Sequence, residues 1–242
     1  MKHIKIENII SVIEKSLDYT KRIELSLNKL GLDESHSIFK RINNAKKLAE
    51  EIKSKFKHAN NDFHQAMKEI TEIYFDFSIE VRFISGKDSE LYKKLKTINK
   101  YLLFLRGTDL HHSDRIIKVT SYLIDIGHIL SYYARGNKQI YNIYMKYANR
   151  MKKEVAGKID IVIRKLLEIE GLIKKFISEI NKIFEELNSI IKIPRYQEIK
   201  KIILTNEEEL KKDMLYLHSL YDEVKFLIAS INRIEQALTH IY

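Results

Sequence analysis

The sequence predicts an all-α protein built from long helices, and three observations support this fold class. The 242 residues include one Pro and seven Gly, so residues that break a helix are rare. Apolar residues recur at intervals of three and four along most of the chain, which is the period of an amphipathic helix. No segment shows the strict alternation of apolar and polar residues that a half-buried strand would have.

The turn and capping signals set the bounds of the predicted helices. Gly31 should end the first helix, because glycine accepts the left-handed conformation found just after a helix. Asp88 or Ser89 should cap a later helix, and Thr205 with Glu208 matches a capping box. The helices expected from these signals span residues 4–30, about 35–59, then to 85, 89–105, 109–134, 139–193, 195–204 and 206–240.

Two of these segments leave alternatives open. Asn60, Asn61 and Asp62 either break the second helix or lie on its surface. Residues 139–193 contain no Pro, and one continuous helix there would be roughly 80 Å long at 1.5 Å per residue. We therefore expect either a turn near Glu168–Gly171 or a long coiled-coil arm.

The predicted helix at residues 109–134 carries an apolar stripe that returns 108 residues later, in the last helix. Its members are Ile116, Val119, Leu123, Ile126, Leu130 and Tyr133, and the later set is Val224, Leu227, Ile231, Ile234, Leu238 and Ile241. Self-similarity at a fixed interval indicates an internal duplication of about half the chain. Residues 109–134 and 217–241 are therefore predicted to occupy equivalent places.

This stretch resembles the third-helix signature of PhoU-type phosphate-uptake regulators. The matching positions are Asp109, Leu110, Lys118, Leu123, Ile126 and Gly127, with Arg233 and Ile234 matching a related C-terminal motif. The resemblance implies two antiparallel three-helix-type bundles, here residues 1–136 and 137–242. It also implies a regulator or adaptor of phosphate transport or signalling, acting through a protein partner, with a homodimer among the forms it can take.

The carboxylates that bind metal clusters in that family are missing here. Ile124 and His128 stand at the family's acidic positions in the first copy, and Asn232 and Gln236 stand there in the second. Neutral side chains cannot offset the charge of clustered cations. The protein is therefore expected to hold no metal cofactor.

An acidic ladder elsewhere provides a weaker metal hypothesis. Its members, at helical steps of three and four, are Glu69, Glu72, Asp76 and Glu80. Such a ladder binds a metal when a second helix supplies more ligands, but a solvated surface is the preferred interpretation. Asp125 and His128 lie one turn apart and are compatible with one ion, although zinc needs three or four ligands. The candidate ligands are thus Glu72, Asp76, Asp125 and His128.

A further pair, Arg106 and His111, resembles the Arg–His motif of HEPN-type helical ribonucleases. In that family the two side chains act on the scissile phosphate across a dimer. Gly107 stands where that family usually has a polar residue, so we expect no enzymatic activity. A helical ribonuclease remains the third hypothesis.

Composition narrows the remaining choices of partner and location. The net charge is +10, yet the lysines are scattered through every predicted helix, which favours a solvated surface. The second hypothesis is an unrelated helical interaction module, with nucleic acid as one candidate partner because of the positive charge. No apolar stretch approaches the roughly 20 residues that cross a bilayer, so a cytoplasmic location is expected.

Overall fold

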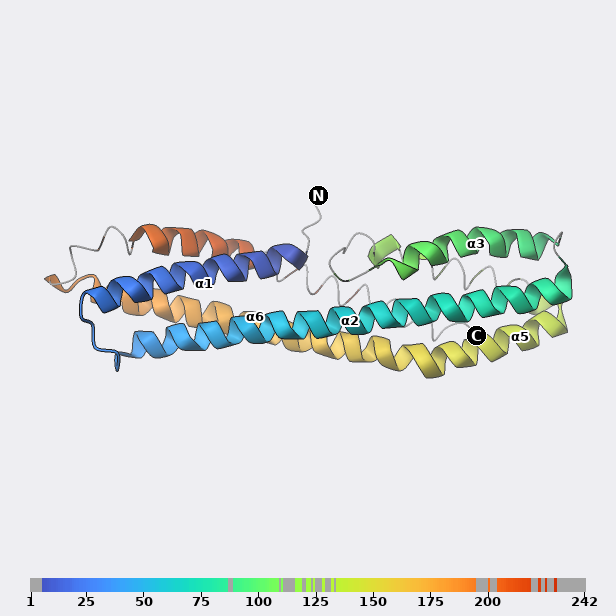
Figure 1. Ribbon diagram of the computed structural model, residues 1–242, viewed down its shortest axis with the longest axis horizontal. Helices are drawn as coiled ribbons and strands as arrows, with labels where there is room; N and C mark the ends of the chain where they lie inside the picture. The colour runs from blue at the N-terminus through green and yellow to red at the C-terminus, as the bar shows by residue number, and fades with distance from the viewer. Residues whose placement is uncertain are drawn as a thin grey trace. The chain divides into compact units, whose positions relative to one another are not determined.

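The computed structural model describes residues 6–86, 89–108, 110, 116–118, 121–122, 124, 128, 132, 134–194, 200, 204–218, 222, 225 and 229 (Figure 1). Regular structure in these residues is helical and includes no strand, which confirms the all-α prediction. No helix in this part of the chain is both long and apolar enough to cross a bilayer.

The helices differ widely in length, from 14 residues in α5 to 49 in α2. Helix α1 is Ile6–Lys29, α2 is Ser37–Ser85 and α3 is Glu90–Arg106. Described residues between 116 and 136 are helical, and residues 204–218 form a later helical stretch. Between them lie α5 (Lys138–Met151), the π-helical segment η1 (Lys152–Ala156) and α6 (Gly157–Ile190).

The predicted duplication stays a prediction, and the order of the helices is compatible with it. Moving α2 along the sequence by the 108-residue interval places it on residues 145–193, which overlap α5, η1 and α6. The same shift places α1 on 114–137, where the described residues up to 136 are helical. The equivalence of residues 109–134 and 217–241 stays a prediction, because most of these residues lie outside the described part.

Contacts divide the chain into two compact units. Unit 1 is built around Lys57–Leu166, and unit 2 contains Ile4–Phe56 together with Leu167–Lys225. The sequence-based boundary between residues 136 and 137 falls inside unit 1. The reason is that α2 and α6 each continue from one unit into the other without leaving the helical conformation.

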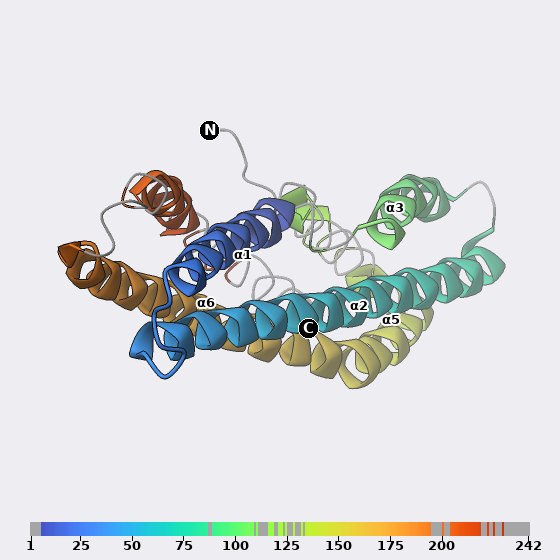
Figure 2. The same cartoon turned by 60° about the vertical axis from the view of Figure 1, so that its left-hand side comes forward.

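The described residues of unit 2 form a bundle of four helical segments. Helices α1 and α2 form an antiparallel pair (Figure 2). Ion pairs from Lys46 to Glu24 and from Lys53 to Glu14 join the two helices. Residues 204–218 reach α1 through the Asn8–Tyr216 hydrogen bond, 3.3 Å long. Each helix presents its apolar stripe to the others, and the fully buried residues include Ile13, Ile23, Ile42, Ile52, Phe176 and Ile180.

The turn that follows α1 forms as the sequence predicts. Gly31 has φ 68°, the left-handed conformation. The Leu32 N–H donates to the Leu27 carbonyl at 3.2 Å, and the Gly31 N–H donates to the Asn28 carbonyl at 2.9 Å. These two bonds are the Schellman pattern that satisfies the last carbonyls of a helix.

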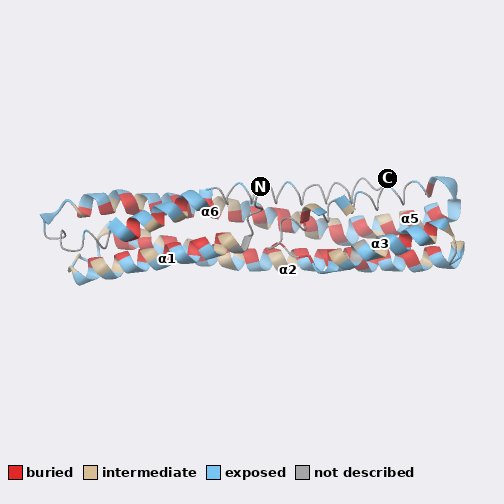
Figure 3. Cartoon of the chain, turned by 90° about the horizontal axis from the view of Figure 1, so that it is seen from above, coloured by how far each residue is buried: buried red, intermediate tan, exposed pale blue. Residues whose placement is uncertain are grey.

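Helix α2 has no break at Asn60–Asp62, so the prediction of a break there is wrong and the alternative is correct. Ala59 and Phe63, on either side of the three polar residues, are both fully buried. The apolar stripe therefore stays in phase across them, and the polar side chains lie on other faces of the same helix. Figure 3 shows buried and exposed bands alternating along α2.

Helix α6 likewise passes through Glu168–Gly171, and the predicted turn at that point is wrong. A helical glycine costs about 1 kcal/mol relative to alanine. Ile169 and Ile173 are fully buried on either side of Gly171. Burial of a large apolar side chain contributes roughly 1.5–3 kcal/mol, which outweighs the cost of the glycine.

Candidate functional site

A row of ion pairs joins α2 to α5 and α6 within unit 1, and we call it the charged seam. Its carboxylates are all on α2 and its cations are on the other two helices. The pairs are Asp62–Lys165, Glu69–Lys158, Asp76–Arg150 and Glu80–Lys146. Three members of the predicted acidic ladder are thus already neutralised by cations of the same chain.

The spacing of these pairs explains the π-helical segment. Glu69 and Asp76 are seven residues apart on α2, whereas their partners Lys158 and Arg150 are eight residues apart. The segment η1, residues 152–156, lies between these two partners. A π-turn closes its hydrogen bonds over one more residue than an α-turn. It therefore absorbs the extra residue and keeps the pairs on both sides in register.

Glu80 is the most highly connected carboxylate of the seam. It accepts a hydrogen bond from the Tyr147 hydroxyl at 2.7 Å as well as from Lys146. Together the hydrogen bonds from Lys146 and Tyr147 hold the pKa of the Glu80 carboxyl below its ordinary value. The Glu80 carboxylate is therefore held in its charged form beside α5, by two side chains of that helix.

The candidate metal ligands are not gathered at one place in the described structure. Glu72 lies 3.8 Å from Lys68, and Asp76 lies 2.8 Å from Arg150. His128 is exposed, and Asp125 lies outside the described residues. Among the residues that the structure describes, no group of three or more His, Asp and Glu side chains is placed to hold an ion. The absence of a metal cofactor in the protein stays a prediction.

The ribonuclease pair is described only in part. Arg106 is the exposed last residue of α3, and Gly107 follows as its C-cap. His111 lies outside the described residues, and the pairing of the two side chains stays a prediction.

The residues of the family signature are also described in part. Leu110 is buried, and its N–H donates to the Asn60 side-chain oxygen at 2.7 Å. This bond gives one of the polar residues of α2 a structural role. Lys118 is helical and exposed. The remaining signature residues lie outside the described part, namely Asp109, Leu123, Ile126, Gly127, Arg233 and Ile234.

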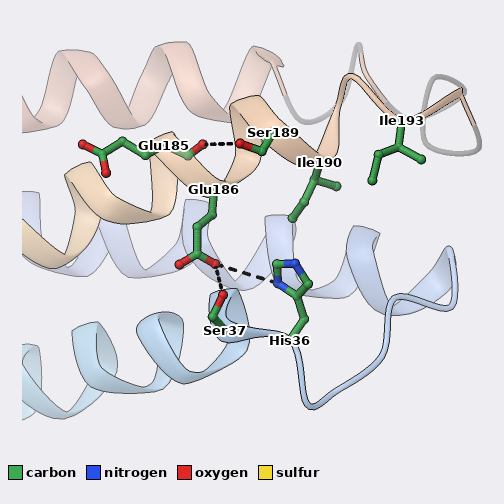
Figure 4. A pocket seen from close by; sticks show the side chains of 7 residues that line it. All are labelled: His36, Ser37, Glu185, Glu186, Ser189, Ile190 and Ile193. Carbon is green, nitrogen blue, oxygen red and sulfur yellow. Dashed lines mark hydrogen bonds and ion pairs between the residues drawn. The ribbon is translucent and has the colours of Figure 1, made fainter.

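A hollow in unit 2 lies at the start of α2 and has a volume of about 370 Å³ (Figure 4). At its centre the Glu186 carboxylate accepts hydrogen bonds from the Ser37 hydroxyl, at 2.6 Å, and from Arg41. Burial raises the pKa of Glu186, but the bonds from Ser37 and Arg41 outweigh it and leave that pKa below its ordinary value.

The arrangement in this hollow does not match a serine nucleophile. In a catalytic triad the serine hydroxyl donates to the imidazole that removes its proton. Here the Ser37 hydroxyl donates to Glu186, while His36 Nδ1 accepts the Ile38 N–H at 3.3 Å. Figure 4 shows the carboxylate between the two side chains, where it holds the start of α2 against α6. We therefore regard this hollow as a structural junction.

Sequence reasoning missed the feature most suited to binding, a row of apolar side chains exposed on α2 in unit 1. We call it the apolar ridge, and it consists of Phe75, Ile79 and Phe83 at 44%, 47% and 85% exposure. Steps of four place the three side chains along one side of the helix. The signal was available in the sequence as a second apolar stripe, out of phase with the buried one that includes Phe77 and Val81.

No family model, curated protein or solved structure matches this chain. The resemblance to PhoU-type regulators therefore rests on the sequence positions alone.

Proposed function

We propose that the protein is a helical adaptor that acts by protein–protein contact and carries out no chemistry of its own. The observation that carries this proposal is the apolar ridge on α2. Three large apolar side chains on successive turns are unusual on a water-exposed helix, and contiguous patches of this kind mark interaction sites.

The dimensions of the ridge suit a groove or helix on a partner protein. Phe75 and Phe83 are eight residues apart, which is roughly 12 Å along a helix at 1.5 Å per residue. Helices that bind in grooves use anchors at spacings of three, four and seven or eight residues. Aromatic side chains are also enriched where binding energy concentrates. Phe83, the most exposed of the three, is the expected principal anchor.

The charges beside the ridge favour a protein partner over nucleic acid. Binding to a phosphate backbone depends on lysine and arginine side chains that are available to neutralise it. On the α5–α6 side of α2, however, Lys146, Arg150 and Lys158 are paired with carboxylates of α2. A nucleic acid would have to displace these internal partners before it gained its own.

The resemblance at residues 109–134 gives the adaptor proposal its specific form. In that form the partner is a component of a phosphate transporter, or a signalling protein that responds to phosphate. The ridge supports contact with a protein, while the link to phosphate rests on the resemblance.

Site-specific photo-crosslinking in the cells that produce the protein tests the proposal. A photoreactive amino acid at Ile79, in the ridge, is expected to crosslink to one discrete protein. The same amino acid at Gln65, an exposed polar position earlier on α2, serves as the matched control and should give no such product. Identification of the product as a phosphate transporter or sensor component would support the specific form.

Binding with purified components then separates the outcomes. Phe83→Asp should weaken binding of the identified partner at least tenfold, while helix content measured by circular dichroism stays unchanged. A crosslink only to a second copy of this chain would make the ridge a homodimer interface and contradict the adaptor proposal. Equal crosslinking at Ile79 and Gln65 would also contradict it.

A further inference from the structure

A small cavity lies between α2 and α5 in unit 1, immediately before the π-helical segment. Three of the residues that line it are tyrosines, namely Tyr74, Tyr144 and Tyr147. The volume within which the centre of a water molecule can lie is about 10 Å³. One buried water needs roughly 10–15 Å³ on the same measure, so the cavity is the size of a single water site.

Two of the three tyrosine hydroxyls have no hydrogen-bond partner among the described residues. The Tyr147 hydroxyl donates to Glu80, as described above. The hydroxyls of Tyr74 and Tyr144 have no hydrogen-bond partner among the described residues, and these side chains are only 5% and 4% exposed. Buried hydroxyls are paired in most proteins, with protein groups or with ordered water, because an unpaired one loses its hydration without compensation.

Both hydroxyls can take part in a bridge. Burial raises the pKa of Tyr144 to about 12 and that of Tyr74 further, so each carries its proton at neutral pH. A protonated hydroxyl has one proton to donate and two lone pairs to accept with. Phe77 and Met151 line the same cavity and offer no strong competing donor or acceptor.

We propose that this cavity is a hydration site, in which one water molecule bridges the hydroxyls of Tyr74 on α2 and Tyr144 on α5. The bridge ties the two helices together within an otherwise apolar layer. The bridge lies next to η1. A hydrogen-bonded link between α2 and α5 fixes the relative position of these two helices just before the π-helical segment that contains the extra residue. This inference concerns the interior of unit 1 and is independent of the adaptor proposal.

The sign of a stability change tests the hydration site. Tyr74→Phe and Tyr144→Phe each remove one hydroxyl and keep the ring. If water bridges the two, each single variant should unfold at a lower urea concentration than the wild type. The double variant should then lose less than the two single losses combined, because the first substitution has already broken the bridge.

Controls and contrary outcomes make the experiment decisive. Tyr141→Phe, at a half-exposed tyrosine of the same helix α5, should leave the urea midpoint unchanged. An unchanged or raised midpoint in either single variant would overturn the proposal, since removing a hydroxyl from a dry apolar cavity relieves an unpaired polar group. Strictly additive losses would overturn it as well, because each hydroxyl would then have its own partner.

Discussion

Ion pairs join α2 to the facing helix in both units, but the charge on the α2 side chains is negative in unit 1 and positive in unit 2. In unit 1 the carboxylates lie on α2 and the cations on α5 and α6. In unit 2 the cations Arg41 and Lys55 lie on α2, while the carboxylates Glu168 and Glu186 lie on α6. Because each long helix changes sign along its length, antiparallel pairing places opposite charges across the contact in both units. Parallel pairing would place like charges together.

The two units also differ in whether the helix that faces α2 is a regular α-helix throughout. In unit 2 the segment of α6 is α-helical without interruption, whereas in unit 1 the π-helical segment η1 separates α5 from α6. The charged seam of unit 1 stays in register only because η1 contains one residue more than an α-helical path requires. The two units should therefore respond differently to the same change in chain length.

The largest expected effect, and the largest difference between the units, comes from deleting one lysine of α6 in unit 2 and comparing this with the deletion of one lysine of η1 in unit 1. An α-helix turns by about 100° per residue. Deletion of Lys175 from α6 in unit 2 should therefore rotate one side of the helix out of its core and cost more than about 4 kcal/mol of the free energy of unfolding. Deletion of Lys153 should convert η1 to an α-helix, keep both flanking faces buried and change that free energy by less than about 1 kcal/mol.

Urea unfolding followed by circular dichroism measures both deletions. Equal destabilisation by the two deletions would contradict the role assigned to η1. A tolerated Lys175 deletion would show that the apolar stripe of α6 does not fix its orientation in unit 2.

Substitution of one buried phenylalanine in each unit should have the next largest effect. Phe63 in unit 1 and Phe176 in unit 2 are both fully buried. Phe63→Ala and Phe176→Ala should each cost about 3–5 kcal/mol, from lost burial together with the cavity that remains. Calorimetric unfolding of both variants checks this, and a cost below about 1 kcal/mol in one unit would mean that its core rearranges to fill the space.

A smaller effect is expected from the two carboxylates whose pKa values are lowered. Glu186 in unit 2 is 18% exposed and Glu80 in unit 1 is 36% exposed. A carboxyl with a lowered folded-state pKa stabilises the protein above its unfolded pKa. That contribution is lost as the pH falls through the folded value. The stabilisation from both residues should therefore be present at pH 7 and decline below about pH 4.5, the ordinary value for Glu.

Glu186→Gln and Glu80→Gln separate these two contributions. Each variant should be less stable than the wild type at pH 7, and the difference should shrink as the pH is lowered into the acidic range. The change should be larger for Glu186→Gln, because its carboxylate is less screened by solvent. A difference between variant and wild type that is independent of pH would contradict the assigned ion pairs.

The smallest effect on stability is expected in the apolar ridge. Phe83→Ala removes a ring that is 85% exposed, so the free energy of unfolding should change by no more than about 0.5 kcal/mol. The same variant should weaken binding of the crosslinked partner. A loss of several kcal/mol in thermal unfolding would instead place Phe83 in a packing role.

Much of the helical framework was predictable because its signals are local. Gly31 ends α1 through its left-handed conformation, and the Ser89 hydroxyl accepts the Tyr92 N–H at 3.1 Å as the predicted cap. The candidate sites were less predictable. The acidic ladder indicated a metal site or a solvated surface, but the cations that pair with Glu69, Asp76 and Glu80 lie 66 to 89 residues away along the chain. No local pattern specifies which distant lysine will face which carboxylate.

The sequence alone determined the fold class, the apolar stripes and the change of charge along each long helix, since all three depend on residue type and helical period. Tertiary structure decided whether α2 and α6 break. A polar cluster or a helical glycine is tolerated only when the stripe on either side of it packs against the same neighbours. Tertiary structure also decided the position of η1. The residues of the segment, KKEVA, occur in ordinary α-helices, so their identities do not indicate a π-helix. The extra residue in η1 is needed only because the partners of Glu69 and Asp76 are one residue further apart along the chain than these two carboxylates are.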